Sequence, residues 1–263
     1  GFLFSLLLIL TMLGVGGGLY VLYHFGRGLP DYKQLADYDP PTVTRVHAGD
    51  GRLIAEYAVE KRVFVPISAM QKRVINAFLS AEDKNFYTHP GIDFLGVVRA
   101  MVTNLANMGS QRRLKGASTI TQQVAKNFLL TNEVSIDRKV KEAILAFRIE
   151  RAFTKDRILE LYLNEIYLGL GSYGVAAAAL NYFNKSLGEL SIAEVAYLAA
   201  LPKAPNNYHP FRYPKAALAR RNWVINRMFD DGHITPGEAL EAKATPLQVR
   251  RREDTQFAKA EYF

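Results

Sequence analysis

Three short polar stretches hold the side chains that could do chemistry. The first, SAEDKNFYTHPG, places Glu82 and Asp83 at the C-terminal end of an apolar helical pattern. The negative end of the helix dipole and partial burial both disfavour a charged carboxylate there, so we expect the pKa of Glu82 to rise toward the range of a general base. A glutamate at such a position can equally be an exposed helix-end acid. His89, in the turn His89-Pro90-Gly91, is more typical of a structural residue than of a catalytic one.

The second stretch, GASTITQQVAKNFLL, runs from Gly116 to Leu130. Thr119 and Gln122 have the spacing of a capping box, which predicts a helix that begins near Ile120. Its first turn offers free backbone N–H groups and the positive end of the dipole, a favourable site for phosphate or pyrophosphate. The side chains expected around that site are Ser118, Thr119, Thr121, Gln122 and Lys126. The alternative is a well-capped surface helix without a ligand.

The third stretch, DRKVKEAILAFRIER, predicts an amphipathic helix from Asp137 to Arg151. Its apolar stripe is expected to contain Val140, Ala143, Ile144 and Phe147, with Arg138, Lys141 and Glu142 on the other side. The plain interpretation is a solvated face with weak helical salt bridges. The functional interpretation is a second acid held among cations that neutralise phosphate. Two acids and neighbouring cations in one cleft suit glycosyl transfer from a phosphate-linked sugar.

A fourth stretch, ILELYLNEIYLGLGSYGVAAAAL, is mostly typical of a core, with Asn164 and Glu165 near a helix end. Its glycines Gly169, Gly171 and Gly174 have dinucleotide-motif spacing but follow no predicted strand, so we do not expect a dinucleotide site.

The pattern along the chain predicts a mainly α protein with a small β element. After a linker from Gly26 to Pro41, a turn at Ala48-Gly49-Asp50-Gly51 predicts a hairpin, and residues 62–67 another strand. Helices are expected at 69–83, 93–107, 119–130, 136–152, 155–165, 172–183, 191–201, 214–231 and 236–243. Capping boxes at Ser191-x-x-Glu194 and Thr235-Pro236-x-Glu238 predict the starts of two of them. Residues 27–67 therefore form a linker and β element, and residues 68–245 a helical domain. Residues 246–263 are expected to begin a linker to a further domain.

The N-terminal segment predicts a membrane anchor. No Asp, Glu, Lys or Arg occurs from Phe2 to Phe25. A helix over these residues is about 36 Å long at ~1.5 Å per residue, against a hydrocarbon core of ~30 Å. A signal peptide has a shorter apolar region. We therefore expect a single transmembrane helix over residues 1–26.

Charge and composition narrow the class of partner. The net charge of +8 suggests an anionic partner, although a basic surface also serves solubility. The absence of cysteine excludes disulfides and cysteine-ligated metals. Nucleic-acid binding is not expected, because the chain is anchored and lacks a known motif. Residues 92–115 are apolar over a wide arc, with Arg99, Arg112, Arg113 and Lys115 at the edges, and suit a segment that dips into the membrane interface. The alternative is a buried core helix followed by a basic loop.

In this order, the stretches closely resemble the motifs of bacterial peptidoglycan glycosyltransferases, the membrane-anchored module of class A penicillin-binding proteins and their monofunctional relatives. The matching residues are Glu82-Asp83-x-x-Phe86-x-x-His89-x-Gly91, Gly116 to Gln123 with Lys126, Arg138-Lys139-x-Lys141-Glu142, Glu160-x-Tyr162-Leu163-Asn164-x-x-Tyr167-x-Gly169, and Arg220-Arg221-x-x-Val224. The resemblance covers nearly the whole chain and favours the class A, bifunctional relatives. No Ser-x-x-Lys nucleophile motif occurs, so transpeptidase activity is not expected of these residues.

The resemblance implies a lysozyme-like α-helical fold that polymerises lipid II with inversion, the growing undecaprenyl-pyrophosphate-linked chain being the donor. It implies that Glu82 is the base and that Glu142 acts on the leaving-group side. The substrate-binding residues it implies are Asp83, Phe86, His89, Gly116, Ser118, Thr119, Gln122, Gln123, Lys126, Arg138, Lys139, Asn164 and Tyr167. Mg²⁺ or Mn²⁺ assists some members at the pyrophosphate, near Glu142 here, and no organic cofactor is expected. The expected location is the bacterial cytoplasmic membrane, single-pass, with the catalytic domain on the outer side. Expected partners are lipid II, the glycan chain and the membrane, together with a second copy of the chain or other cell-wall proteins.

Two other functions compete with this one. A lytic transglycosylase would cleave glycan with one glutamate in a similar fold, but it would have no pyrophosphate for the cations around Glu142 to neutralise. A membrane-tethered scaffold would bind peptidoglycan without catalysis.

Overall fold

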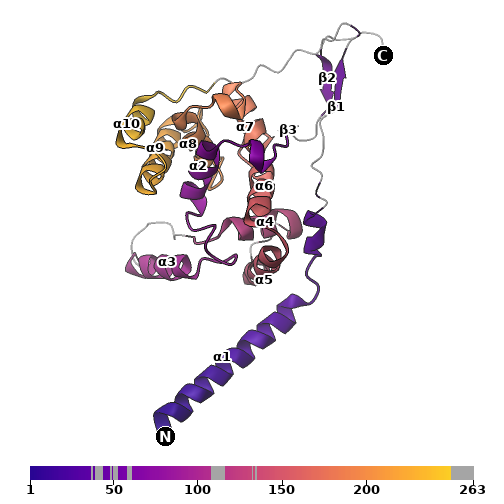
Figure 1. The fold of residues 1–263 in the computed structure, drawn as a ribbon, viewed down its shortest axis with the longest axis vertical. Coiled ribbons are helices and arrows are strands. Elements are labelled where there is room, and N and C mark those ends of the chain that lie inside the picture. The colour runs from indigo at the N-terminus through magenta and orange to yellow at the C-terminus, as the bar shows by residue number, and fades with distance from the viewer. Residues whose placement is uncertain are drawn as a thin grey trace. The chain divides into compact units, whose positions relative to one another are not determined.

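The computed structural model describes residues 1–36, 38, 44–47, 49, 53–57, 61–107, 116–131, 133 and 135–249; for 44–47, 53–57, 61 and 62 it describes the backbone alone. The chain divides into two compact units, and Figure 1 shows the helices and strands along the chain. Unit 1 contains Gly1–Asp37 and Thr88–Ile158, and unit 2 contains Tyr38–Tyr87 and Leu159–Phe263. The boundary runs through helix α6 (Lys155–Glu165). Both units are mainly α-helical, as predicted.

In unit 1, helix α5 (Ile136–Ala152) is the element on which the others pack. It contacts α4 (Ile120–Leu129), the 3-10 helix η1 (Tyr32–Leu35) and α1 (Phe2–Gly26). Its buried face contains Glu142, Leu145, Ala146 and Ile149, together with Ile144 of the predicted stripe. The predicted apolar stripe is therefore partly wrong: Phe147 is exposed and its ring lies 6.2 Å from that of Phe94, outside the core.

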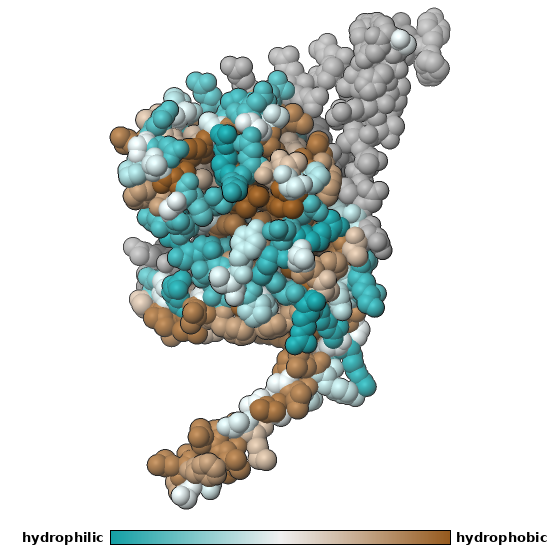
Figure 2. Space-filling view, viewed as in Figure 1, coloured by the Kyte–Doolittle hydropathy of each residue, from teal (hydrophilic) through white to brown (hydrophobic). Residues whose placement is uncertain are grey.

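Helices α1 and α3 (Phe94–Ala106) carry exposed apolar side chains, shown in brown in Figure 2. Helix α1 is long and apolar enough to cross a membrane, by length and composition. Helix α3 begins at Asp93, whose carboxylate accepts the N–H of Gly96 at 2.8 Å, and none of its residues is buried. The core-helix alternative for this segment is therefore wrong. The basic end of the predicted membrane-facing segment, with Arg112, Arg113 and Lys115, lies outside the described residues.

Unit 2 has an apolar core between helices. Helix α8 (Ile192–Ala200) packs against α9 (Pro214–Asp230) and α2 (Lys72–Glu82), and α9 also contacts α10 (Pro236–Ala244). Helix α7 (Val175–Phe183) contacts α8 as well. Predicted capping boxes begin α8 at Ser191 and α10 at Thr235. The 3-10 helix η3 (Leu187–Glu189) precedes α8.

The strands confirm the predicted hairpin and correct two boundaries. Strands β1 (Thr44–His47) and β2 (Leu53–Tyr57) pair antiparallel, with Thr44 opposite Tyr57; apart from Gly49, the turn that joins them lies outside the described residues. The strand predicted at 62–67 is wrong beyond Arg62: β3 is Lys61–Arg62, and Ile67–Ala69 forms the 3-10 helix η2 before α2.

Strand β3 pairs parallel with β4 (Ser172–Tyr173), where a helix was predicted. Helix α7 starts only at Val175 because Gly174 has a φ of +79°, which favours glycine, and a Cβ there would lie 2.5 Å from the carbonyl oxygen of Asn164.

Candidate active site

The N-terminus of α4 is built as the sequence predicted. The Thr119 hydroxyl accepts the Gln122 N–H at 3.2 Å, and Gln122 Oε1 accepts the Thr119 N–H at 3.0 Å, which completes the capping box. Thr119 Oγ1 also donates to the carbonyl oxygen of Gly91 at 2.6 Å. Both side chains are buried, whereas Ser118 just before the helix is exposed. Of these three side chains, Ser118 is therefore the one turned to solvent.

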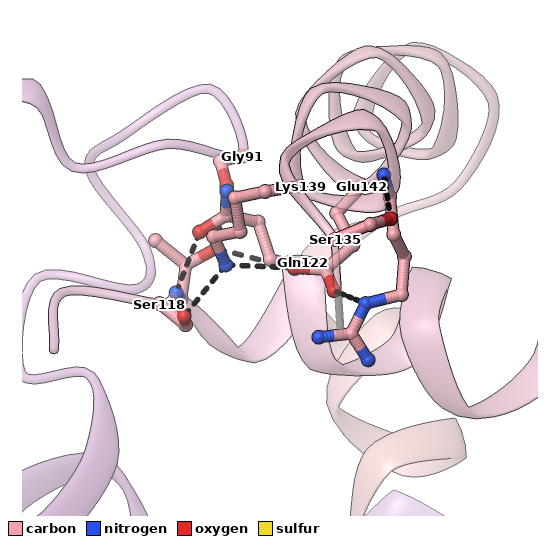
Figure 3. Close-up of polar contacts among 8 residues, drawn as sticks. Gly91, Ser118, Gln122, Ser135, Lys139 and Glu142 are labelled. Atoms are coloured by element: carbon pink, nitrogen blue, oxygen red, sulfur yellow. Dashed lines mark hydrogen bonds and ion pairs between the residues drawn. The ribbon is translucent and has the colours of Figure 1, made fainter. Parts of the chain in front are cut away.

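A cationic cluster joins that helix end to α5 (Figure 3). Lys139 Nζ donates to Ser118 Oγ and to Glu142 Oε2, at 2.7 Å in each case. Arg138 Nε lies 3.3 Å from the other carboxylate oxygen of Glu142, an ion pair without hydrogen-bond geometry. We call Arg138, Lys139 and Glu142 the α5 cluster; its formal charge sums to +1.

Burial decides between the two interpretations of Glu142. Only 3% of this residue is exposed, while about half of the Lys139 side chain is exposed. A buried carboxylate with two cations of its own helix is not a solvated face, so that interpretation is wrong. Its second cation is Lys139 at i,i+3, a residue that the family resemblance implied, and not Lys141 of the predicted polar face, because adjacent residues on a helix do not face each other.

The other predicted residues of unit 1 differ in burial. Gln123 and Lys126 are half-buried on α4, and Gly116 is exposed ahead of it. His89 is buried, and its Nδ1 accepts the N–H of Gly91 at 3.2 Å. That bond closes the turn, which fits the structural role expected of His89.

In unit 2, Glu82 is the last residue of α2 and Asp83 is its C-cap, as the sequence predicted. Glu82 is half-buried and Asp83 is buried. The predicted rise in the pKa of Glu82 stays a prediction. Phe86 is fully buried, with its ring 5.2 Å from that of Tyr87, so it contributes to packing.

Two further side chains of unit 2 lie within electrostatic reach of Glu82. Burial raises the pKa of Tyr162 well above its usual value, and the charges of Glu82 and Asp83 add to that rise. Burial lowers the pKa of Arg220, while the charges of Glu82 and Tyr208 oppose that fall. The Arg220 guanidinium stacks 3.8 Å from the centre of the Trp223 ring. Arg220 therefore places a cation near the predicted base.

Asn164 and Tyr167 differ in their access to solvent. Asn164 is buried; its amide accepts the N–H of Val65 at 2.8 Å and donates to the Val65 and Glu160 carbonyls at 2.9 and 2.8 Å. These bonds give it a structural role that its spacing did not reveal. Tyr167 is 38% exposed, and its ring lies 5.0 Å from that of Tyr173.

The described residues do not fit a protein-held divalent cation. No group of three or more His, Asp or Glu among them could hold a metal ion. Both carboxylate oxygens of Glu142 already contact cations, at 3.3 and 2.7 Å. We therefore derive no step through Mg²⁺ or Mn²⁺.

Glu150 and Lys155 were missed by sequence reasoning. Glu150 lies in the last turn of α5 and Lys155 is the first residue of α6, so no helical spacing relates them. Nevertheless their side chains meet at 2.7 Å, and Thr121, expected at the anion site, instead donates to Glu150 at 2.6 Å. For Thr121, the prediction is corrected: its hydroxyl is fully buried and faces α5.

Comparison with known proteins shows which family and which relatives this chain resembles. A family model described as Transglycosylase matches residues 50–229. Penicillin-binding protein 1A of Rickettsia felis is 55% identical over 262 residues, which cover 100% of this chain and 33% of that protein. Penicillin-binding protein 1A of Aquifex aeolicus is 46% identical over 261 residues, covering 97% and 35%. A crystal structure of Penicillin-Binding Protein 1A from Haemophilus influenzae has 28% identity and a TM-score of 0.47, over 82% of this chain and 22% of that one. The chain spans about a third of the length of the curated relatives it matches.

Proposed function

This chain belongs to the transglycosylase family, and we propose that it is a peptidoglycan glycosyltransferase that polymerises lipid II into glycan strands. We assign it inverting transfer from an undecaprenyl-pyrophosphate-linked chain to the 4-hydroxyl of lipid II. Glycosyl transfer is the only activity we assign to these residues, since they hold no Ser-x-x-Lys motif.

The α5 cluster beside the N-terminus of α4 is the observation that carries this proposal. Lys139 reaches from α5 to Ser118, directly before the capped first turn of α4. The helix end and the net positive charge of the cluster both favour an anion at that place. A departing pyrophosphate gains negative charge in the transition state, so cations fixed beside it lower the barrier. A glycan-cleaving enzyme has no such leaving group.

In the proposed reaction the 4-hydroxyl of lipid II attacks C1 of the donor sugar. The new bond forms between that oxygen and C1 while the bond from C1 to the pyrophosphate oxygen breaks. Glu82 accepts the hydroxyl proton as general base. Arg138, Lys139 and Lys126 stabilise the leaving undecaprenyl pyrophosphate, and the buried Glu142 holds the first two of these cations in place.

The apolar surface of unit 1 supports a membrane-bound substrate. Helix α1 has the length of a single membrane span, and α3 exposes large apolar side chains beyond the core. The exposed set on α3 is Phe94, Leu95, Val98, Met101, Val102 and Leu105. We propose that both helices enter the cytoplasmic membrane from its outer side, where a lipid-linked sugar would reach the site.

The test is polymerisation of labelled lipid II by the purified chain in detergent. The wild type should yield glycan polymer and release one undecaprenyl pyrophosphate for each glycosidic bond formed. Glu82→Gln should abolish both while leaving the circular dichroism spectrum unchanged, because an amide cannot accept the hydroxyl proton. General-base loss typically costs about 10²- to 10⁴-fold in rate.

Glu241→Gln is the matched control, since Glu241 is an exposed acid of α10 and should leave the rate unchanged. Polymer formation by Glu82→Gln at the wild-type rate would exclude Glu82 as the base. Cleavage of added glycan without lipid II consumption would identify a lytic enzyme, and binding without turnover a scaffold.

A further inference from the structure

A largely buried ionic network ties the turn at His89–Gly91 to α4, α5 and the first turn of α6. Lys155 Nζ, at the start of α6, donates to the carbonyl oxygen of His89 and to Glu150 Oε1, at 2.7 Å each. The same Glu150 oxygen accepts the Thr121 hydroxyl of α4 at 2.6 Å. Thr121 is fully buried, and the Glu150 and Lys155 side chains are 9% and 20% exposed. The Thr121 hydroxyl is therefore enclosed and the two charges are largely shielded from solvent, where removal of one partner has large consequences.

The turn itself has little room to shift. Gly91 has a φ of +96°, and a Cβ there would lie 3.0 Å from both the Ala146 carbonyl oxygen and Glu150 Cγ. The Gly91 carbonyl oxygen accepts the Thr119 hydroxyl that also caps α4. Any displacement of the turn therefore moves the N-cap of α4.

The first turn of α4 is held from two sides by this arrangement. Thr119 binds it to the turn at Gly91, and Thr121 binds it to Glu150 on α5. Lys155 joins both anchors, since it contacts the turn and Glu150 at once. The helix end held in this way is adjacent to Ser118, which the α5 cluster contacts.

We propose that Thr121, Glu150 and Lys155 are positioning residues that fix the N-terminus of α4 for the departing pyrophosphate. None of the three needs to touch substrate. This inference rests on the proposed function, because it concerns the placement of that same site. A displacement of about 1 Å in such a helix end can cost roughly 100-fold in rate.

The test compares Lys155→Met, the double variant Glu150→Gln/Lys155→Met, and Thr121→Val in the lipid II assay. We expect Lys155→Met to lower kcat by about 10- to 100-fold with a KM within threefold of wild type, because the helix end is displaced in the transition state. The double variant removes the unpaired charge of Glu150, but it does not restore the hydrogen bond from residue 155 to the His89 carbonyl. It should regain thermal stability and stay slow.

Thr121→Val and two further variants keep the test decisive. Thr121→Val changes one buried hydroxyl at constant shape and should fold, with a loss of about fivefold in kcat, the equivalent of one hydrogen bond. Lys185→Met is the matched control: Lys185 also contacts a glutamate, Glu194, at 2.7 Å, but in unit 2, and its loss should leave kcat unchanged. Lys155→Arg, which keeps the charge, should recover part of the rate.

The outcomes separate the two proposals. If the wild type makes no polymer, the proposed function fails and this inference falls with it. If the wild type polymerises lipid II but the double variant regains full kcat together with its stability, the network is merely structural and the inference alone is wrong. Equal kcat for Thr121→Val and wild type would also contradict it.

Discussion

Two buried polar side chains of α4 and α5, those of Thr121 and Glu142, bond to other side chains, whereas the buried arginine of α9 also donates to two backbone carbonyls. Glu142 meets Lys139, and Thr121 meets Glu150. Arg221, fully buried, donates to the carbonyl oxygens of Thr245 and Lys243 at 2.6 and 3.0 Å, just beyond and within the last turn of α10, with Asn222 as its side-chain partner. Around α4 and α5, buried polar side chains place charge at the N-terminus of α4. In α9, buried Arg221 satisfies the free carbonyls at the C-terminus of α10.

This difference separates two kinds of mutational effect. A side chain that satisfies backbone carbonyls leaves them buried and unpaired when it is removed, and that cost appears in the free energy of unfolding. A side chain that sets the charge beside a ligand can be replaced by a neutral one of equal shape, and the cost then appears in the rate. The comparison predicts that stability and activity can be lost separately.

The largest effect is expected for Glu142→Gln. The amide keeps the shape of the carboxylate and can still accept from Lys139, but it leaves Arg138 without its counter-charge, so the free energy of unfolding should fall by about 1–3 kcal/mol and the protein should still fold. The rate of lipid II polymerisation should fall about 10³-fold, equivalent to about 4 kcal/mol, because the cations lose the charge that orients them. Turnover and thermal melting of the same sample measure both. A loss of rate below tenfold would show that Glu142 has no role in the active site.

Arg221→Met should show the reverse pattern, with a somewhat smaller energy. Methionine fills much of the volume, but the Lys243 and Thr245 carbonyls lose their donors, which should lower the free energy of unfolding by about 3 kcal/mol. Chemical denaturation measures this loss, and the turnover of the folded fraction should fall by less than tenfold. A stable but inactive variant would overturn the comparison, because Arg221 would then act in the site.

Local spacing was sufficient to predict elements whose contacts are local. The capping boxes at Thr119, Ser191 and Thr235 involve residues three apart, and the structure confirms all three. The existence of the helices followed for the same reason. The error at residues 172–174 had a tertiary cause: β4 pairs with β3, far away in the chain, and Gly174 packs on Asn164. Strand β3 lies outside any window of helical length, and the contact of Gly174 with Asn164 does not follow the spacing of a helical face.

The candidate site shows the same limit. The Arg138–Glu142 pair is one helical turn apart and was predicted, as was the helix end at Thr119. The contact of Lys155 with His89 joins residues 66 apart, and that of Thr121 with Glu150 joins residues 29 apart. Both contacts form only when the helices pack together. Hydrophobic periodicity carries no information about which distant polar residues will then be in contact. The motifs therefore revealed the charged residues of the α5 cluster, but not the contacts of Thr121, Glu150 and Lys155 that support the neighbouring helix end.

The smallest effect is expected for the carboxylate of Glu238. Like Arg221, this side chain satisfies a free backbone group at an end of α10. Its oxygen accepts the Thr235 N–H at 2.7 Å and the Thr235 hydroxyl at 2.8 Å, and these two bonds lower the pKa of Glu238 below 4.5. Since the folded pKa lies below the unfolded one, the stabilisation is complete above pH 4.5 and is lost as the pH falls through the folded pKa. The difference in melting temperature between wild type and Glu238→Gln should therefore narrow between pH 6 and pH 3. Glu241→Gln, on the same helix but outside the capping box, controls for the loss of one exposed charge. A gap that stays constant over this range would show that the box contributes through its shape, as a neutral glutamine also could, and that the charge of Glu238 has no part in it.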